Sequence, residues 1–88
     1  MSIAAEEIVH HHRLVDIVVN KHLVRVEGPE TTGLQIKEAA IAQGVDIQVS
    51  FQLSEKLGDH KTKVIGNSDP VTLHEGEVFV AVADDDNS

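Results

Sequence analysis

The sequence predicts an α+β fold in which one helix packs on a mixed sheet of four to five strands. One stretch, residues 31–44, has the signals of a helix with both ends marked. The segments before and after it are rich in β-branched residues and separated by turn-forming residues, as is typical of strands. One helix therefore faces several strands.

The predicted helix begins near Thr31 or Thr32, either of which can accept a hydrogen bond from a free backbone N–H of the first turn. Pro29 ends the preceding strand, and Gly44 supplies the left-handed residue that closes the helix. Small and apolar residues fall on one side, which lets the helix axis lie close to a sheet. That side holds Gly33, Ile36, Ala39, Ala40 and Gln43.

Leu34 and Ile41 fall on the opposite side of this helix. Single apolar residues on a surface are common, so a loop covering them is the favoured interpretation. A contact surface for a partner is the alternative.

Before the helix, residues 14–20 and 22–27 form two strands joined by a turn at Asn20-Lys21. Their β-branched content and the short turn predict a hairpin. In the second strand Val24 and Val26 alternate with Arg25, which predicts that one face of the hairpin meets the helix.

After the helix, residues 45–53 alternate strictly between apolar and polar side chains, and this pattern predicts a strand. The polar stretch 54–69 is predicted to be a connection that contains one short edge strand at 63–65. Residues 71–73, a turn at 74–76 and a last strand at 77–83 complete the domain. The order of elements predicts a β-grasp sheet in which the last strand pairs beside the first.

The last strand is apolar on both faces, so its orientation has two interpretations. We expect Val78, Val80 and Val82 to point inward. Phe79, Ala81 and Ala83 would then lie outward as candidate partner-binding residues; burial of Phe79 in the core is nearly as well supported.

Composition limits the classes of function. The chain has 88 residues, no cysteine, and a net charge of -8, which disfavours nucleic acid as a partner and leaves no thiol chemistry. No apolar run is long enough to span a membrane, and there is no secretory signal, so we expect a cytoplasmic protein. We divide it into a flexible N-terminal arm (1–13), a folded domain (14–83) and a flexible acidic tail (84–88).

No pattern predicts catalysis, a metal site or a cofactor. Three successive side chains, His10 to His12, cannot converge on one ion from a regular helix or strand, although adventitious nickel binding is plausible. Serine, aspartate and histidine residues are scattered without a nucleophile elbow, a triad order or a phosphate loop. We therefore expect a binding role.

Four short motifs carry a resemblance to a known family. They are the run 17–21, the Thr32-Gly33 entry followed by Ile36 and Ala40, the strand end 51–54, and the run 77–79. In this order and spacing they resemble the bacterial multiubiquitin family of ubiquitin-like domains. The resemblance covers residues 14–83 and implies a ubiquitin-like β-grasp fold.

The resemblance also implies a protein modifier joined to targets by an isopeptide bond. Its implied partners are an E1-like activating enzyme, an E2-like conjugating enzyme, a deubiquitinase-like metallopeptidase and target proteins, encoded in operons proposed to act in antiphage defence. The alternative is an interaction module that is not conjugated. This chain departs from the family pattern because it holds one copy of the domain and does not end in Gly-Gly.

Under the modifier hypothesis the tail supplies the reacting carboxylate. The candidate conjugation and processing residues are Asp84, Asp85, Asp86, Asn87 and Ser88. A reacting aspartate would carry a second carboxylate next to the first, and this like charge opposes adenylate formation. We therefore favour trimming of Ser88 and joining through Asn87.

Overall fold

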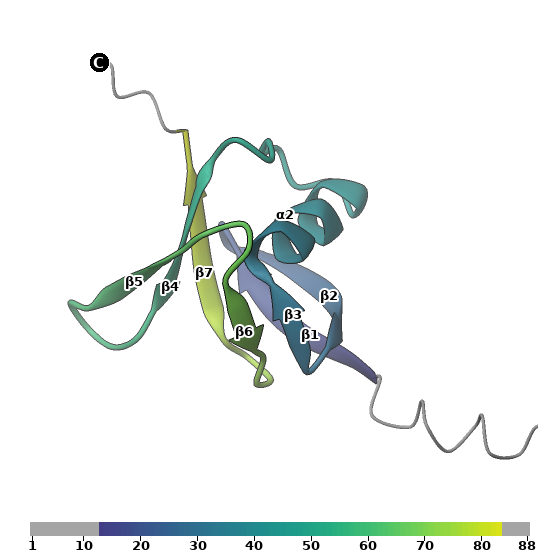
Figure 1. Cartoon of the computed structure of the whole chain (residues 1–88), viewed down its shortest axis with the longest axis horizontal. Helices are drawn as coiled ribbons and strands as arrows, with labels where there is room; N and C mark the ends of the chain where they lie inside the picture. Colours follow the sequence, from purple (N-terminus) through teal and green to yellow (C-terminus); the bar gives the residue numbers. More distant parts are fainter. Residues whose placement is uncertain (1–12, 84–88) are drawn as a thin grey trace, which may run out of the picture.

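The computed structural model describes residues 13–83, which form a five-stranded sheet with a helix across one face and a separate two-stranded sheet (Figure 1). The elements are β1 (Arg13–Val19), β2 (His22–Gly28), β3 (Glu30–Thr32), α2 (Gly33–Ala42), β4 (Gln52–Lys56), β5 (Thr62–Ile65), β6 (Pro70–Thr72) and β7 (Val78–Val82). The predicted arm 1–13 lies outside the described residues except for Arg13, which begins β1. The predicted tail 84–88 lies outside them entirely.

The five-stranded sheet has the order β2-β1-β7-β4-β5. β7 runs parallel to β1 and antiparallel to β4, and the two hairpins β1–β2 and β4–β5 flank this centre. β3 and β6 form a separate two-stranded ladder. The last strand therefore pairs beside the first, which confirms the predicted β-grasp sheet and its mixed character.

The β1–β2 hairpin turns at the predicted dipeptide. Asn20 and Lys21 both have positive φ, 50° and 71°, and Val19 pairs with His22 across them. Two successive positive φ values are the signature of a type I′ turn, whose twist matches that of the two strands. Val24 and Val26 are buried while Arg25 is exposed, as the alternation predicted.

The helix begins where the sequence indicated. The Thr32 hydroxyl oxygen accepts a hydrogen bond from the Gln35 N–H at 3.3 Å, and Gly44 follows the helix with φ 97°. Ile36 and Ala40 are fully buried against the sheet. Gly33 permits the loop before β6 to approach the start of the helix, because a Cβ there would clash with the Gly66 carbonyl oxygen. The predicted buried side of the helix is confirmed for these three residues.

The two apolar residues on the other side of α2 differ in how far they are exposed to solvent. Leu34 is half-buried, and its N–H donates to the Asn67 carbonyl at 3.1 Å, so the loop before β6 lies against this end of the helix. Ile41 is 38% exposed. The loop interpretation therefore fits Leu34 better than Ile41.

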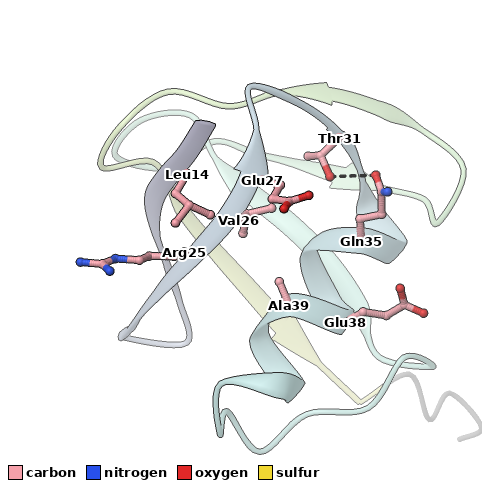
Figure 2. A pocket seen from close by; sticks show the side chains of 8 residues that line it. All are labelled: Leu14, Arg25, Val26, Glu27, Thr31, Gln35, Glu38 and Ala39. Atoms are coloured by element: carbon pink, nitrogen blue, oxygen red, sulfur yellow. Dashed lines mark hydrogen bonds between the residues drawn. The ribbon is translucent and has the colours of Figure 1, made fainter. Parts of the chain in front are cut away.

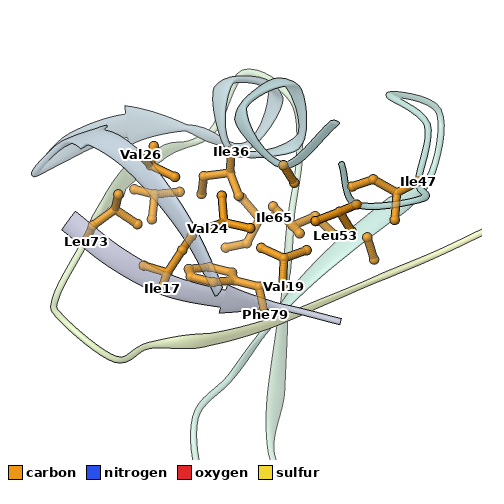
Figure 3. Close-up of a cluster of buried hydrophobic side chains, with 14 of the residues drawn as sticks. Ile17, Val19, Val24, Val26, Ile36, Ile47, Leu53, Ile65, Leu73 and Phe79 are labelled. Carbon is orange, nitrogen blue, oxygen red and sulfur yellow. The ribbon is translucent and has the colours of Figure 1, made fainter. Parts of the chain in front are cut away.

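The core lies between α2 and the sheet (Figure 3). The Phe79 ring points into it and has no exposed surface. Our expectation for β7 is therefore wrong: Phe79 and Ala81 face the helix, and the valines face away. Phe79 pairs with the buried Val19 of β1, and residues paired across a ladder share a face. The large ring fills the volume beneath the helix that a valine would leave empty.

The segment 45–53 is not one strand. Regular structure begins only at Gln52, and residues 45–51 form an irregular connection in which Val45 and Ile47 are buried but Val49 is 44% exposed. The cause is Lys37, whose ammonium donates to the carbonyls of Val49 at 2.6 Å and Phe51 at 2.7 Å. Burial lowers the pKa of Lys37. Because the lysine binds these two carbonyls, they do not pair in a sheet.

The remaining connections agree with the sequence. The predicted edge strand 63–65 is β5, which is one residue longer and does lie at the sheet edge. The turn before β7 is tightened at Gly76, which has φ 84° and donates its N–H to the Asp16 carbonyl at 2.8 Å. This bond ties the start of β7 to β1.

Candidate functional site

The outward face of β7 is the most apolar exposed surface of the central strands. With Phe79 and Ala81 turned inward, Val78 and Val82 are 37% and 49% exposed, and Val80 between them is half-buried. Three β-branched side chains in a row on a solvent-facing strand give no stability to the core. This exposure is the feature that needs a functional explanation.

Neighbouring strands extend the apolar surface. Val18 of β1 pairs with Val78, and Leu23 of β2 pairs with Val18. On the other side Ser54 of β4 separates Val80 from Val64 of β5. Leu23 is 63% exposed and Val64 56%. We call the set Val18, Leu23, Val64, Val78, Val80 and Val82 the valine face. Exposed apolar surface of this kind, here interrupted by Ser54, marks interaction sites.

A shallow hollow of about 360 Å³ lies over β7 within the valine face. Val18, Val78, Val80 and Val82 line it together with the ammonium-bearing side chains Lys21 and Lys56. A partner that docks here would bury an apolar centre and place acidic groups beside the two lysines. An apolar centre surrounded by a charged rim is the usual composition of a protein interface.

Asn20 holds the end of β7 in place. Its side-chain amide donates to the Ala81 carbonyl at 2.9 Å and accepts from the Ala81 N–H at 2.8 Å. β1 ends at Val19, so this amide continues the β1–β7 ladder by one step. The chain therefore leaves the sheet from a fixed point at Val82, beside the valine face.

The predicted partner-binding residues are thus divided. Phe79 and Ala81 are buried and cannot contact a partner, which corrects that part of the prediction. Ala83 is exposed directly after β7. The five candidate conjugation residues, Asp84 to Ser88, lie outside the described residues. The exposed side chains of β7 are therefore Val78 and Val82, which were expected from the sequence to point inward.

A separate cluster of charged groups lies where β4, β7 and the preceding turn meet. Glu77 accepts from the His74 N–H at 3.1 Å, and its other oxygen lies 3.3 Å from His74 Nδ1. The pKa of Glu55 is raised, first by burial and then by its hydrogen bond to Glu77 and the Glu77 charge. Lys63 and His74 oppose the increase. The folded state therefore favours the protonated form of Glu55 more than the unfolded state does.

We expect Glu55→Gln to stabilise the domain at pH 7. A raised folded pKa means that this group stabilises the fold below its ordinary pKa of 4.5, and that the contribution is lost as pH rises through the folded value. The neutral amide keeps a donor for Glu77 without the charge, a gain of about 0.5–1 kcal/mol, the scale of partly exposed charge pairs.

Thermal melts at pH 3.5 and pH 7 measure this effect. The parent and Glu55→Gln should converge at the lower pH and separate at the higher one. The exposed Glu30→Gln is the matched control and should change neither melt. A constant difference in melting temperature between the parent and Glu55→Gln at both pH values would show that the raised pKa of Glu55 is not the cause.

Neither a metal site nor a membrane helix is found in the described part of the chain. Across residues 13–83, no three histidine, cysteine or acidic side chains are grouped so that they could hold an ion. The same residues contain no helix of the length and hydropathy that crossing a bilayer requires. His10 to His12 lie outside the described residues.

The β-grasp fold agrees with a family assignment made from the sequence. The multiubiquitin family model matches residues 15–85. The chain belongs to the multiubiquitin family. No curated protein and no solved structure matches this chain. Multiubiquitin domains are ubiquitin-like, and ubiquitin-like β-grasp domains generally act as modifiers or interaction modules and not as enzymes.

Proposed function

We propose that this multiubiquitin-family domain is a bacterial protein modifier that acts in the cytoplasm. In this proposal an E1-like enzyme activates its C-terminal carboxylate, an E2-like enzyme carries it, and the product is an isopeptide bond to a target protein. A deubiquitinase-like metallopeptidase trims or releases it, within an operon for antiphage defence. The family membership supports the proposal.

The observation that carries the proposal is the position of the valine face. It lies on the strand from which the C-terminal segment departs, and Asn20 fixes that departure point. An enzyme that binds the valine face would therefore have the following residues, from Ala83 onward, within reach of its reacting centre. Holding a reactive group at a fixed offset from a docking surface is an efficient way to position it for acyl transfer.

The test is reconstitution with candidate E1-like and E2-like enzymes, ATP and a cell extract. We expect a conjugate detectable by intact mass, with loss of one water per bond formed. Val78→Asp and Val82→Asp should each lower its yield at least tenfold, because each places a charge in the apolar centre. Gln48→Asp, exposed on the 45–51 connection, is the control and should conjugate normally.

Two results would count against the modifier. If the enzymes bind the chain through the valine face but no conjugate forms, the domain is an interaction module that docks without being joined. If the two valine variants conjugate as well as the parent, then the valine face is not the docking surface. Melting curves of all three variants exclude a trivial loss of folding.

The residue that is joined can be read from the same spectra. We expect the metallopeptidase to remove Ser88, so that the conjugated chain ends at Asn87. The neutral side chain avoids the like charge that Asp84, Asp85 or Asp86 would place beside the reacting carboxylate. A conjugate that retains Ser88 would make that serine the acyl donor and rule out processing.

A further inference from the structure

A second surface lies at the outer edge of the sheet, where β2 runs past α2 (Figure 2). The groove between them has a volume of about 270 Å³. Leu14, Val26 and Ala39 supply apolar atoms to it, and the Thr31–Gln35 hydrogen bond of 3.0 Å lies at one side. The valine face is on different side chains, so this groove needs its own explanation.

β2 is an edge strand, and its outer edge borders the groove. In a two-residue hairpin the paired residues alternate between bonding each other and pointing their backbone groups outward. Val19 and His22 close this hairpin, so Leu23, Arg25 and Glu27 turn their N–H and C=O groups away from β1. Such a row is a template for a further strand.

Gln43 covers the middle of that row. Its side-chain carbonyl accepts from the Arg25 N–H at 2.9 Å, and its side-chain N–H donates to the Arg25 carbonyl at 2.6 Å. These are the two bonds that a residue of an added strand would make. The amide of Gln43 therefore occupies the place of one strand residue, and an added strand would have to displace it.

The charges around the groove favour a basic occupant. Glu27 and Glu38 line it from β2 and α2. The one cationic lining residue, Arg25, bonds Asp16 at 3.2 Å and is neutralised there. Of the ion pairs formed among residues 13–83, none includes Glu27 or Glu38. An extended segment with basic side chains on both of its faces would meet both carboxylates.

We propose that the β2–α2 groove binds an extended, lysine- or arginine-bearing peptide segment of another protein, which adds to β2 as a sixth strand after displacing Gln43. Backbone bonds to Leu23, Arg25 and Glu27 supply affinity, and Glu27 and Glu38 select basic side chains. The inference stands apart from conjugation, because it shares only the backbone of Leu23 with the valine face and does not use the tail.

The test is a titration of the full ¹⁵N-labelled chain, followed by NMR, with an acetylated and amidated peptide in which pairs of adjacent lysines alternate with valines, so that lysines point to both faces of the added strand. We expect saturable shifts at Arg25, Glu27 and Ala39. Replacing the peptide's lysines with glutamate should abolish them. The double variant Glu27→Gln, Glu38→Gln should bind at least fivefold more weakly, the combined scale of two exposed charge pairs.

Two further variants separate strand addition from general attraction to an acidic protein. Gln43→Ala removes the competing amide and should bind the peptide several-fold more tightly. Asp59→Asn removes an acidic group at the exposed β4–β5 turn and should bind as the parent does. Unchanged core amide signals confirm that each variant is folded.

Three outcomes would overturn the proposal. Shifts confined to the valine face would place the peptide elsewhere. Equal weakening by Asp59→Asn and by the groove variants would show only nonspecific charge attraction. Shifts at β2 that grow with protein concentration and need no peptide would make a second copy of the chain the occupant.

Discussion

Ile36→Asp is expected to unfold the domain. Ile36 has no exposed surface and lies between α2 and the sheet (Figure 3). An aspartate there must either bury its charge without a partner or take up a proton, and each costs several kcal/mol. Small domains are stable by about 5–15 kcal/mol, so the loss is comparable with the whole stability. Circular dichroism at 25 °C should show loss of the helix signal.

Ile41→Asp is the matched control, since it makes the same change on the same helix at a side chain that is 38% exposed. Its cost should be about 1 kcal/mol, from helix propensity and an acidic group near the helix C-terminus. If Ile36→Asp melted within a few degrees of the parent, then the assignment of the buried helix face would be wrong.

Phe79→Ala is expected to remove about 3–5 kcal/mol of stability, the usual cost of deleting a buried aromatic ring and leaving a cavity. Phe79 is the largest fully buried side chain among the described residues. It lies on the central strand, beneath the helix and beside Val19, so no single neighbour can move in to fill the space. Urea denaturation should show a lower midpoint with a similar slope.

Val78→Ala, one residue earlier and on the opposite face, provides the comparison. It removes outward apolar surface that is already 37% exposed, so its cost in stability should be below about 1 kcal/mol. The two substitutions should therefore separate the roles of the two faces of β7. Equal losses from both would mean that the valines, too, are covered in solution.

Parts of this fold could be predicted because the signals are local. A threonine cap at its start and a glycine after its end define α2. A two-residue turn between β-branched segments defines the β1–β2 hairpin. Each depends on backbone preferences of a few neighbouring residues. The order of these elements then restricts the topology to a sheet closed by its last strand.

The orientation of β7 could not be obtained from the sequence, because both of its faces are apolar. Alternation distinguishes faces only when one of them is polar. The register against β1, which places Phe79 beside Val19, decided which set lies inside. For the same reason Phe79 and Ala81 were expected from the sequence to be exposed, whereas the structure buries them and exposes Val78 and Val82.

Three polar side chains fix features of the fold that the local sequence signals do not determine. Lys37 binds the carbonyls that would otherwise continue the 45–53 strand, Asn20 fixes the end of β7, and Gln43 covers the edge of β2. The sequence by itself determined the helix, the first hairpin and the closing of the sheet by its last strand. Only the tertiary structure decided which face is buried, where β4 begins and which sheet edge is open, because these depend on contacts between residues distant in the chain.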